Sequence, residues 1–204
     1  MGHPTIRTIF GAPGTTRLDP QTTAFILIDI QNEYYTGKLY VPDGDAVLGN
    51  ANRLITLADK RAMPVFHIQQ WNPVTRPLFT QDSVMAEIHA GLLQAPHHSV
   101  IRKRFPSAFA STDLQAQLQA RGIKTIILGG ILTNNCVAAT AYDGVAHGYQ
   151  MIIASDAVAA RGLDVGDGTT ISHKDLHKAF LLGLSDAAAE VQATDAILAF
   201  SYDA

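Results

Sequence analysis

Three side chains that could take part in catalysis follow apolar segments of the length of β-strands. Asp29 ends the run AFILID, and Lys103 ends the run HSVIRK. Cys136, the single cysteine of the chain, comes six residues after the run KTIILGG (124–130). A carboxylate, an ammonium group and a thiol can serve as base, cation and nucleophile in covalent catalysis. The sequence therefore raises the question of whether the fold brings these three groups together.

Each of the three residues also has an ordinary structural explanation. A carboxylate at the end of a strand often caps a turn, and a basic triplet such as RKR (102–104) usually lies in solvent. A lone cysteine is more often a small buried residue than a nucleophile. Because successive strand residues point to opposite faces, however, Arg102 and Arg104 can lie in water while Lys103 points inward.

The apolar runs alternate with segments of helical periodicity, which predicts an α/β fold. Strands are expected at 24–29, 64–69, 98–103, 124–130 and 149–156. Helices are expected at 45–61, 111–122, 136–148, 173–190 and 194–200. Strands that are apolar on both faces and alternate with helices form parallel sheets covered on both sides. We expect a three-layer α/β/α architecture with a mainly parallel, Rossmann-like central sheet of about six strands.

The length of 204 residues suits one domain with a sizeable core, so a single domain is expected over 1–204. Residues 1–20 are rich in Gly, Pro and Thr and are expected to form an irregular N-terminal arm. Residues 70–97 are expected to form a long loop near the site, with a short helix at 83–92.

Composition narrows the possible partners. The net charge of −3 provides no basic field for nucleic acid, so no nucleic-acid partner is expected. No apolar run reaches the roughly 18 residues of a membrane span, and no membrane partner is expected. A single cysteine cannot form an internal disulfide, and the N-terminus lacks the pattern of a signal peptide, which favours a cytoplasmic location. Charged residues make up only 16% of the chain, which agrees with a homo-oligomer of two or more subunits and equally with a composition rich in Ala, Gly and Thr.

The predicted sheet places the reactive groups at one edge. In parallel α/β sheets, ligands bind outside the carboxyl ends of the strands. Asp29, Lys103 and the turn that leads to Cys136 should therefore meet there, with Asp156 at the end of the fifth strand. Cys136 should open the helix 136–148, and the N–H groups at a helix N-terminus stabilise a thiolate.

Three segments of the chain resemble the isochorismatase-like cysteine hydrolases, which include nicotinamidase, N-carbamoylsarcosine amidase and ureidoacrylate amidohydrolase. The segments are FILIDIQNEY (25–34), IRKRFPSAFASTDLQAQL (101–118) and IILGGILTNNCVAATAYDGVAHGYQMIIASDA (126–157). The resemblance implies that Asp29, Lys103 and Cys136 form a catalytic triad. It also implies a cis peptide bond between Ile131 and Leu132, and an oxyanion hole made by the backbone N–H groups of Leu132 and Cys136.

The resemblance implies hydrolysis of a C–N bond in a small-molecule amide, ureide or carbamoyl compound, through a thioester on Cys136. An isochorismatase-type hydrolase of a C–O bond is the alternative within the family, and the cysteine favours attack on a carbonyl carbon. A non-catalytic binding module of flavodoxin type would need a phosphate-binding glycine loop, which DIQNEYYTG (29–37) does not offer. A redox protein would lack a second cysteine to resolve an oxidised Cys136.

One segment departs from the resemblance. Nicotinamidases carry Asp-Trp-His-Pro after the second strand and bind a metal there, whereas this chain has QWNP (70–73). Neutral amides are poor ligands for transition metals, so we expect no metal site and no cofactor.

Five further residues are expected to line the substrate pocket: Gln31, Tyr34, Trp71, Phe105 and Thr133. Aromatic side chains with few charged groups among these candidates favour a small, neutral or weakly polar amide as the substrate.

Overall fold

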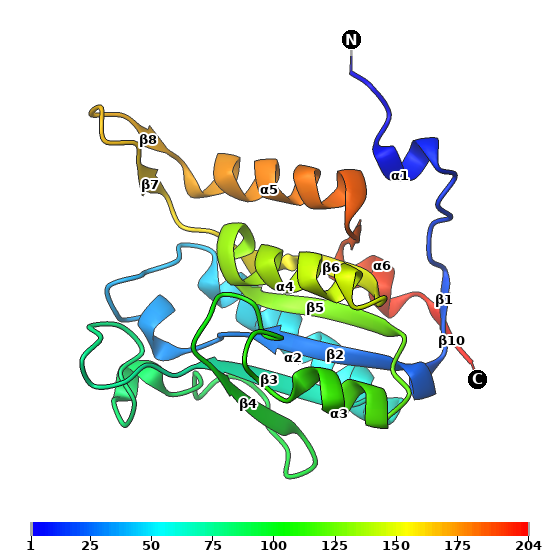
Figure 1. Cartoon of the computed structure of the whole chain (residues 1–204), viewed down its shortest axis with the longest axis horizontal. Coiled ribbons are helices and arrows are strands. Elements are labelled where there is room, and N and C mark those ends of the chain that lie inside the picture. The colour runs from blue at the N-terminus through cyan, green and yellow to red at the C-terminus, as the bar shows by residue number, and fades with distance from the viewer. Residues whose placement is uncertain (1, 204) are drawn as a thin grey trace.

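A computed structural model describes residues 2–203 and shows three layers, with a central sheet between two layers of helices (Figure 1). The six strands of this sheet lie in the order β4-β3-β2-β5-β6-β9, and every neighbouring pair is parallel. The strands are β2 (Thr23–Ile28), β3 (Val65–Gln70), β4 (Ser99–Lys103), β5 (Thr125–Ile131), β6 (Gln150–Ala159) and β9 (Glu190–Gln192). The predicted fold class is confirmed.

The helices pack on opposite faces of the sheet, and Figure 1 shows α3 and α4 in front of it with α2 behind. The helices are α2 (Gly44–Lys60), α3 (Leu114–Ala120), α4 (Ala138–Ala146), α5 (His173–Ala187) and α6 (Thr194–Leu198). Side chains of β2 alternate between two apolar cores: Phe25 and Leu27 pack with α2, whereas Ile26 and Ile28 pack with α3 and α4. This alternation follows from the pleat of a strand buried on both faces.

The structure differs from the sequence prediction at the short elements. The arm contains a helix, α1 (Ile6–Ile9), and a strand, β1 (Arg17–Leu18), that pairs with β10 (Ser201–Tyr202). The helix expected at 83–92 is only a 3₁₀ turn, η3 (Val84–Ala86). Two further 3₁₀ turns, η1 (Pro20–Thr22) and η2 (Asn32–Tyr34), flank β2.

A hairpin of β7 (Leu163–Asp164) and β8 (Thr170–Ile171) projects from the body at the upper left of Figure 1. Strand β9 has only three residues, which is too short to show a pattern in the sequence. Among the described residues, no helix is long and apolar enough to cross a membrane.

Gly130 allows β5 to lie against β2 where the chain turns toward Cys136. Gly130 pairs with Ile28 across the ladder, and its φ of +121° lies in a region that L side chains rarely adopt. A Cβ at this position would lie 2.5 Å from the Ile28 nitrogen and still closer to its carbonyl oxygen. Both backbones are fixed by strand pairing, so neither can move aside.

We therefore expect Gly130→Ala to lower the free energy of unfolding by more than about 3 kcal/mol, through backbone collision and a strained φ. Gly49→Ala is the matched control, because a Cβ at Gly49 of α2 meets nothing within 4 Å. This control should stabilise the helix by about 0.5–1 kcal/mol. Urea denaturation of both variants measures these changes, and a Gly130→Ala protein as stable as the wild type would contradict the account.

Candidate active site

A buried ammonium group lies at the centre of the site. The Nζ atom of Lys103 is 2.7 Å from Asp29 Oδ2 and donates to Gln70 Oε1 at 2.7 Å. It also donates to the Phe105 carbonyl at 3.2 Å and approaches Cys136 Sγ at 3.3 Å. Lys103 is 1% exposed and Asp29 is fully buried. The sequence prediction that Asp29, Lys103 and Cys136 come together at one edge of the sheet is confirmed.

Three adjacent strands position these groups. Asp29 directly follows β2, Gln70 ends β3 and Lys103 ends β4, and Gln70 pairs with Lys103 in the ladder. Asp29 has a φ of +51°, a left-handed conformation that Asp tolerates better than most residues. The turn after β2 therefore begins at the carboxylate itself.

Cys136 lies in a π-helical turn, η4 (Thr133–Val137), that continues into α4. The α-helix expected from Cys136 onward begins two residues later, at Ala138. The peptide bond between Ile131 and Leu132 is cis, and it is the bond at which the resemblance places one. Leu132 and Cys136 both line the pocket above the site.

Burial and the neighbouring charges set the protonation of the site. Burial, with the Asp29 charge, raises the pKa of the Cys136 thiol to about 12. Burial opposes the charge of Lys103, but Asp29 and Cys136 outweigh it, so the pKa of Lys103 is raised. Burial also raises the pKa of Asp29, and the ammonium group offsets part of that shift. Burial and the Asp29 carboxylate both disfavour the charged form of Cys136, which opposes the thiolate expected from a helix N-terminus.

The side-chain amides of Gln70 and Asn72 form a chain of hydrogen bonds that ends at Lys103. Gln70 Nε2 donates to Asn72 Oδ1 at 2.7 Å, and Asn72 Nδ2 donates to the Leu78 carbonyl at 2.9 Å. These bonds turn Gln70 Oε1 toward Lys103 Nζ. Gln70 and Asn72 stand where the resemblance places the metal ligands of nicotinamidases, yet both are neutral and their oxygens already accept hydrogen bonds. They do not fit a metal centre.

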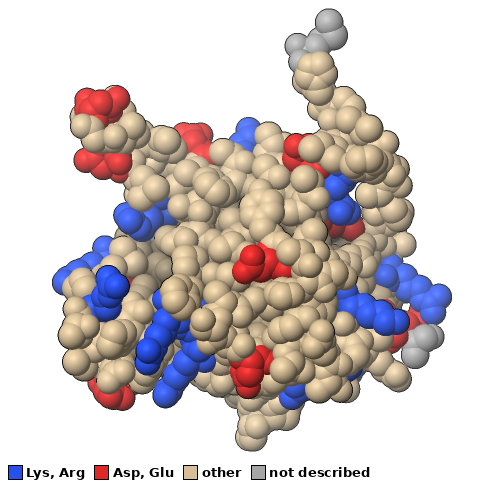
Figure 2. All heavy atoms as spheres, viewed as in Figure 1, with Lys and Arg blue, Asp and Glu red and all other residues tan. Residues whose placement is uncertain are grey.

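A cavity of about 530 Å³ opens above Cys136. Two of the expected substrate-binding residues, Tyr34 and Phe105, line it. Figure 2 shows Lys and Arg side chains on the left of the molecule, where Figure 1 places the loops that follow β3 and β4. The volume of the cavity above Cys136 is within the range of small-molecule sites, roughly 300–1,000 Å³.

The other three expected substrate-binding residues, Gln31, Trp71 and Thr133, lie outside the lining and make contacts within the protein. Gln31 is buried. Its Nε2 donates to the Gln70 and Ala86 carbonyls, and its Oε1 accepts from the Gln70 N–H. Trp71 stacks under the Arg102 guanidinium, 3.9 Å from the ring centroid.

Thr133 is also fully buried, and its hydroxyl is 2.9 Å from His177 Nδ1 of α5. In each of these three cases the residue type suits either role, and only the direction of the side chain decides between them.

Asp156 lies within β6 rather than at its end. Its carboxylate accepts from the Thr194 N–H and hydroxyl at 2.8 and 2.6 Å, so it anchors the start of α6 instead of joining the site.

Sequence reasoning missed the charged part of the pocket. Arg76, Arg104 and Arg161 line it, with Asn135 beside the thiol. The expectation of few charged groups in the pocket is wrong. Arg161 also follows a strand end, but the sequence carried no signal for it, because β6 continues to Ala159, three residues beyond the predicted strand.

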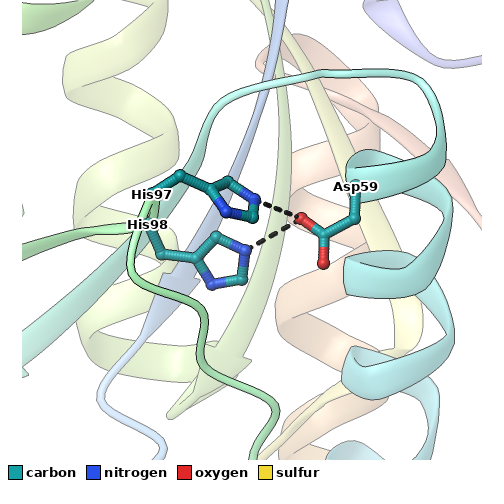
Figure 3. A group of neighbouring side chains, drawn as sticks. All are labelled: Asp59, His97 and His98. Atoms are coloured by element: carbon teal, nitrogen blue, oxygen red, sulfur yellow. Dashed lines mark hydrogen bonds and ion pairs between the residues drawn. The ribbon is translucent and has the colours of Figure 1, made fainter.

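A second polar cluster lies at the opposite end of the sheet, where α2 ends and β4 begins (Figure 3). His97 Nε2 and His98 Nε2 are each 2.9 Å from Asp59 Oδ1. Two histidines and an aspartate are residue types that can ligate a metal. However, the Ala95 N–H donates a hydrogen bond to His98 Nδ1 at 3.1 Å. That bond places the ring proton on Nε2, facing Asp59. The cluster therefore ties the loop to α2 as a hydrogen-bonded clamp.

Comparison with known proteins gives consistent results. A family model for the isochorismatase domain matches residues 23–196. A secreted isochorismatase effector of Verticillium dahliae is 33% identical, over 84% of this chain and 98% of the relative. The crystal structure of an isochorismatase from Pseudomonas putida superimposes with a TM-score of 0.88 at 27% identity, covering 95% of this chain and 98% of that one.

Two other relatives are named for amide hydrolysis. A maleamate amidohydrolase of Pseudomonas putida is 28% identical, over 79% of this chain and 78% of the relative. A ureidoacrylate amidohydrolase of Methylobacterium radiotolerans is 27% identical, over 74% of this chain and 72% of the relative.

The raised pKa of Cys136 generates a spectroscopic prediction. A thiolate absorbs near 240 nm and a thiol does not, so the wild-type minus Cys136→Ser difference should stay near zero from pH 6 to pH 9. Since a raised pKa keeps the thiol protonated below it, the signal should appear only as the pH approaches about 12 or the protein unfolds. A full thiolate signal at pH 7 would contradict the neutral resting thiol.

Proposed function

The chain belongs to the isochorismatase family, and from this premise we propose that it is a cysteine hydrolase that cleaves a C–N bond of a small amide, ureide or carbamoyl compound. Members of the family are hydrolases, and some are named amidohydrolases. One observation carries the proposal: a thiol at the floor of the pocket contacts Lys103, whose ammonium group is paired with the buried Asp29 carboxylate.

The first half-reaction forms a thioester. As Cys136 Sγ attacks the carbonyl carbon, its proton passes to Asp29, and Lys103 stays protonated throughout. The backbone N–H groups of Leu132 and Cys136 hold the oxyanion of the tetrahedral intermediate. When this intermediate collapses, the C–N bond breaks and Asp29 returns the proton to the leaving nitrogen, so ammonia or an amine departs.

The second half-reaction consumes one water. Asp29 accepts a proton from the water as its oxygen attacks the thioester carbonyl. The C–S bond then breaks, the proton returns to the sulfur, and the acid is released. Atoms and charge balance with water as the single co-reactant, so the proposed reaction requires no cofactor.

A neutral thiol suits this proposal because Asp29 is then an unprotonated base at the moment of attack. Burial raises the pKa of the Asp29 carboxyl group, which brings it closer to the pKa of the Cys136 thiol. The proton transfer from sulfur to carboxylate is therefore less unfavourable. A C–O hydrolase of the same family is the second candidate, and no contact of the site favours it over attack on a carbonyl. A binding module or a redox protein would leave the Lys103–Asp29 pair without a role.

A homo-oligomer in the cytoplasm remains part of the proposal. The single cysteine supports the cytoplasmic location, although one relative is named as secreted. The low share of charged residues supports an oligomer, as do large apolar side chains exposed on or beside helices: Phe10 after α1, Tyr142 on α4 and Leu182 on α5.

Ammonia release across a panel of carboxamides, ureides and carbamoyl compounds tests the reaction. Cys136→Ser should lower kcat on any substrate found by at least about 10³-fold, since a hydroxyl is a far weaker nucleophile beside the same base. Ala139→Ser on α4 is the matched control, because it adds a hydroxyl outside the pocket lining and should keep activity. Hydrolysis of a vinyl ether but of no panel compound would favour the C–O hydrolase.

Light scattering tests the oligomer. The expected mass is that of a dimer or a larger assembly, because association would cover the exposed apolar side chains. A monomer mass at all concentrations would overturn this part of the proposal and leave the catalytic part intact.

A further inference from the structure

We propose that Phe79 limits the length of the substrate: the acyl chain ends against the Phe79 ring, which separates the cavity above Cys136 from a second cavity. The inference rests on the proposed function and specifies its substrate class as amides with a short acyl chain. The position of the two cavities, the packing of the ring and the backbone of Phe79 each support it.

The two cavities share a wall. The second cavity also has a volume of about 530 Å³, and Cys136 is not in its lining. Within residues 2–203, Phe79 alone lines both cavities. In the segment 76–80 the residues before and after it divide between the two: Arg76 and Leu78 line the first cavity, and Pro77 and Thr80 line the second. This segment therefore runs between the cavities.

The Phe79 ring joins this segment to the loop on the other side of the wall. The ring is only 5% exposed, and it packs against Tyr34 with 5.2 Å between the ring centroids and an angle of 57° between the planes. The loop that contains Tyr34 also divides, because Tyr34 and Leu39 line the first cavity and residues 36–38 line the second. A tilted aromatic pair is a favourable contact, so the ring is held in place across the wall.

The backbone of Phe79 is held in an unusual conformation. Its φ of +49° is left-handed, which is uncommon for a bulky residue and persists where surrounding contacts maintain it. The Asn72 N–H donates to the Phe79 carbonyl at 2.9 Å, and the Asn72 side chain donates to the Leu78 carbonyl at 2.9 Å. The Gln81 N–H donates to the Asn72 carbonyl at 2.8 Å. These bonds on both sides of Phe79 fix the direction in which its ring points.

The lining of the first cavity directs an apolar chain toward Phe79. Arg76 and Arg104 are exposed, so they lie where the cavity opens to water, whereas Leu78 and Phe79 are partly or fully buried. An apolar chain is more stable against buried apolar side chains than in water beside guanidinium groups. The acyl chain on Cys136 therefore extends toward the ring, and a longer chain has no cavity to enter beyond it.

Ammonia release from straight-chain amides, acetamide to octanamide, tests the length limit. In the wild type, kcat/KM should rise with the first added carbons and then stop rising. Phe79→Ala joins the two cavities, so each further CH₂ group should raise kcat/KM up to about fourfold, and the octanamide-to-butanamide ratio should increase at least about 10-fold. Phe180→Ala is the matched control, because Phe180 of α5 lines neither cavity, and it should keep the wild-type ratio.

A second readout does not depend on the hydrolase reaction. Because Cys136 is the single cysteine, alkyl methanethiosulfonates from methyl to octyl label this residue alone. Intact mass gives each labelling rate, which is divided by the rate of the same reagent with glutathione. This ratio should stop rising with chain length in the wild type and continue to rise in Phe79→Ala. If Phe79→Ala does not fold, Phe79→Gly replaces it, because glycine adopts a φ of +49° without strain.

The outcomes separate the length limit from the proposed function. If no amide is cleaved, but labelling shows a limit in the wild type that is lost in the Phe79 variant, the length limit stands without the amide hydrolase. If the wild type cleaves amides with a kcat/KM that keeps rising to octanamide, the length limit is overturned and the hydrolase stands. A limit that is unchanged in the Phe79 variants, or labelling that is equal or absent at every chain length, also overturns the length limit.

Discussion

The structure depends on one buried cation, the Lys103 ammonium group. Placing such a charge out of water costs several kcal/mol unless it is paired and hydrogen-bonded. Here the Asp29 carboxylate, the Gln70 amide, the Phe105 carbonyl and the Cys136 thiol surround it. Each of these groups lies at the carboxyl end of a different strand, or in the loop that follows that strand. The register of β2, β3, β4 and β5 must therefore be held for the cation to be tolerated.

The same cation determines what the site can do. It stabilises a negative charge on either Asp29 or Cys136, so a proton moving from sulfur to carboxylate leaves the net charge of the buried group unchanged. In the proposed mechanism, the thiol therefore stays protonated at rest and loses its proton only during attack. Gln70 and Asn72 hold the ammonium group in place by hydrogen bonding.

Much of this arrangement could be predicted from the sequence, because burial on both faces leaves a pattern in a strand such as β2 or β5. Once the strands are parallel, their carboxyl ends lie at one edge of the sheet, so the proximity of Asp29, Lys103 and Cys136 can be predicted. Side-chain direction leaves no such pattern: Gln31 and Thr133 have polar side chains suited to a pocket, yet both turn into the protein. Arg161 was missed because the sequence does not show where β6 stops.

The proposed hydrolase carries its acyl group on Cys136 during turnover. Acid quench during steady-state turnover of a substrate from the amide panel, followed by intact-mass and peptide mass spectrometry, measures this directly. We expect an added mass equal to the substrate minus its leaving amine, confined to the peptide that contains Cys136 and lost at high pH or with hydroxylamine. Turnover that continues undiminished in the Cys136→Ser chain, with no adduct on the wild type at any time point, would contradict it.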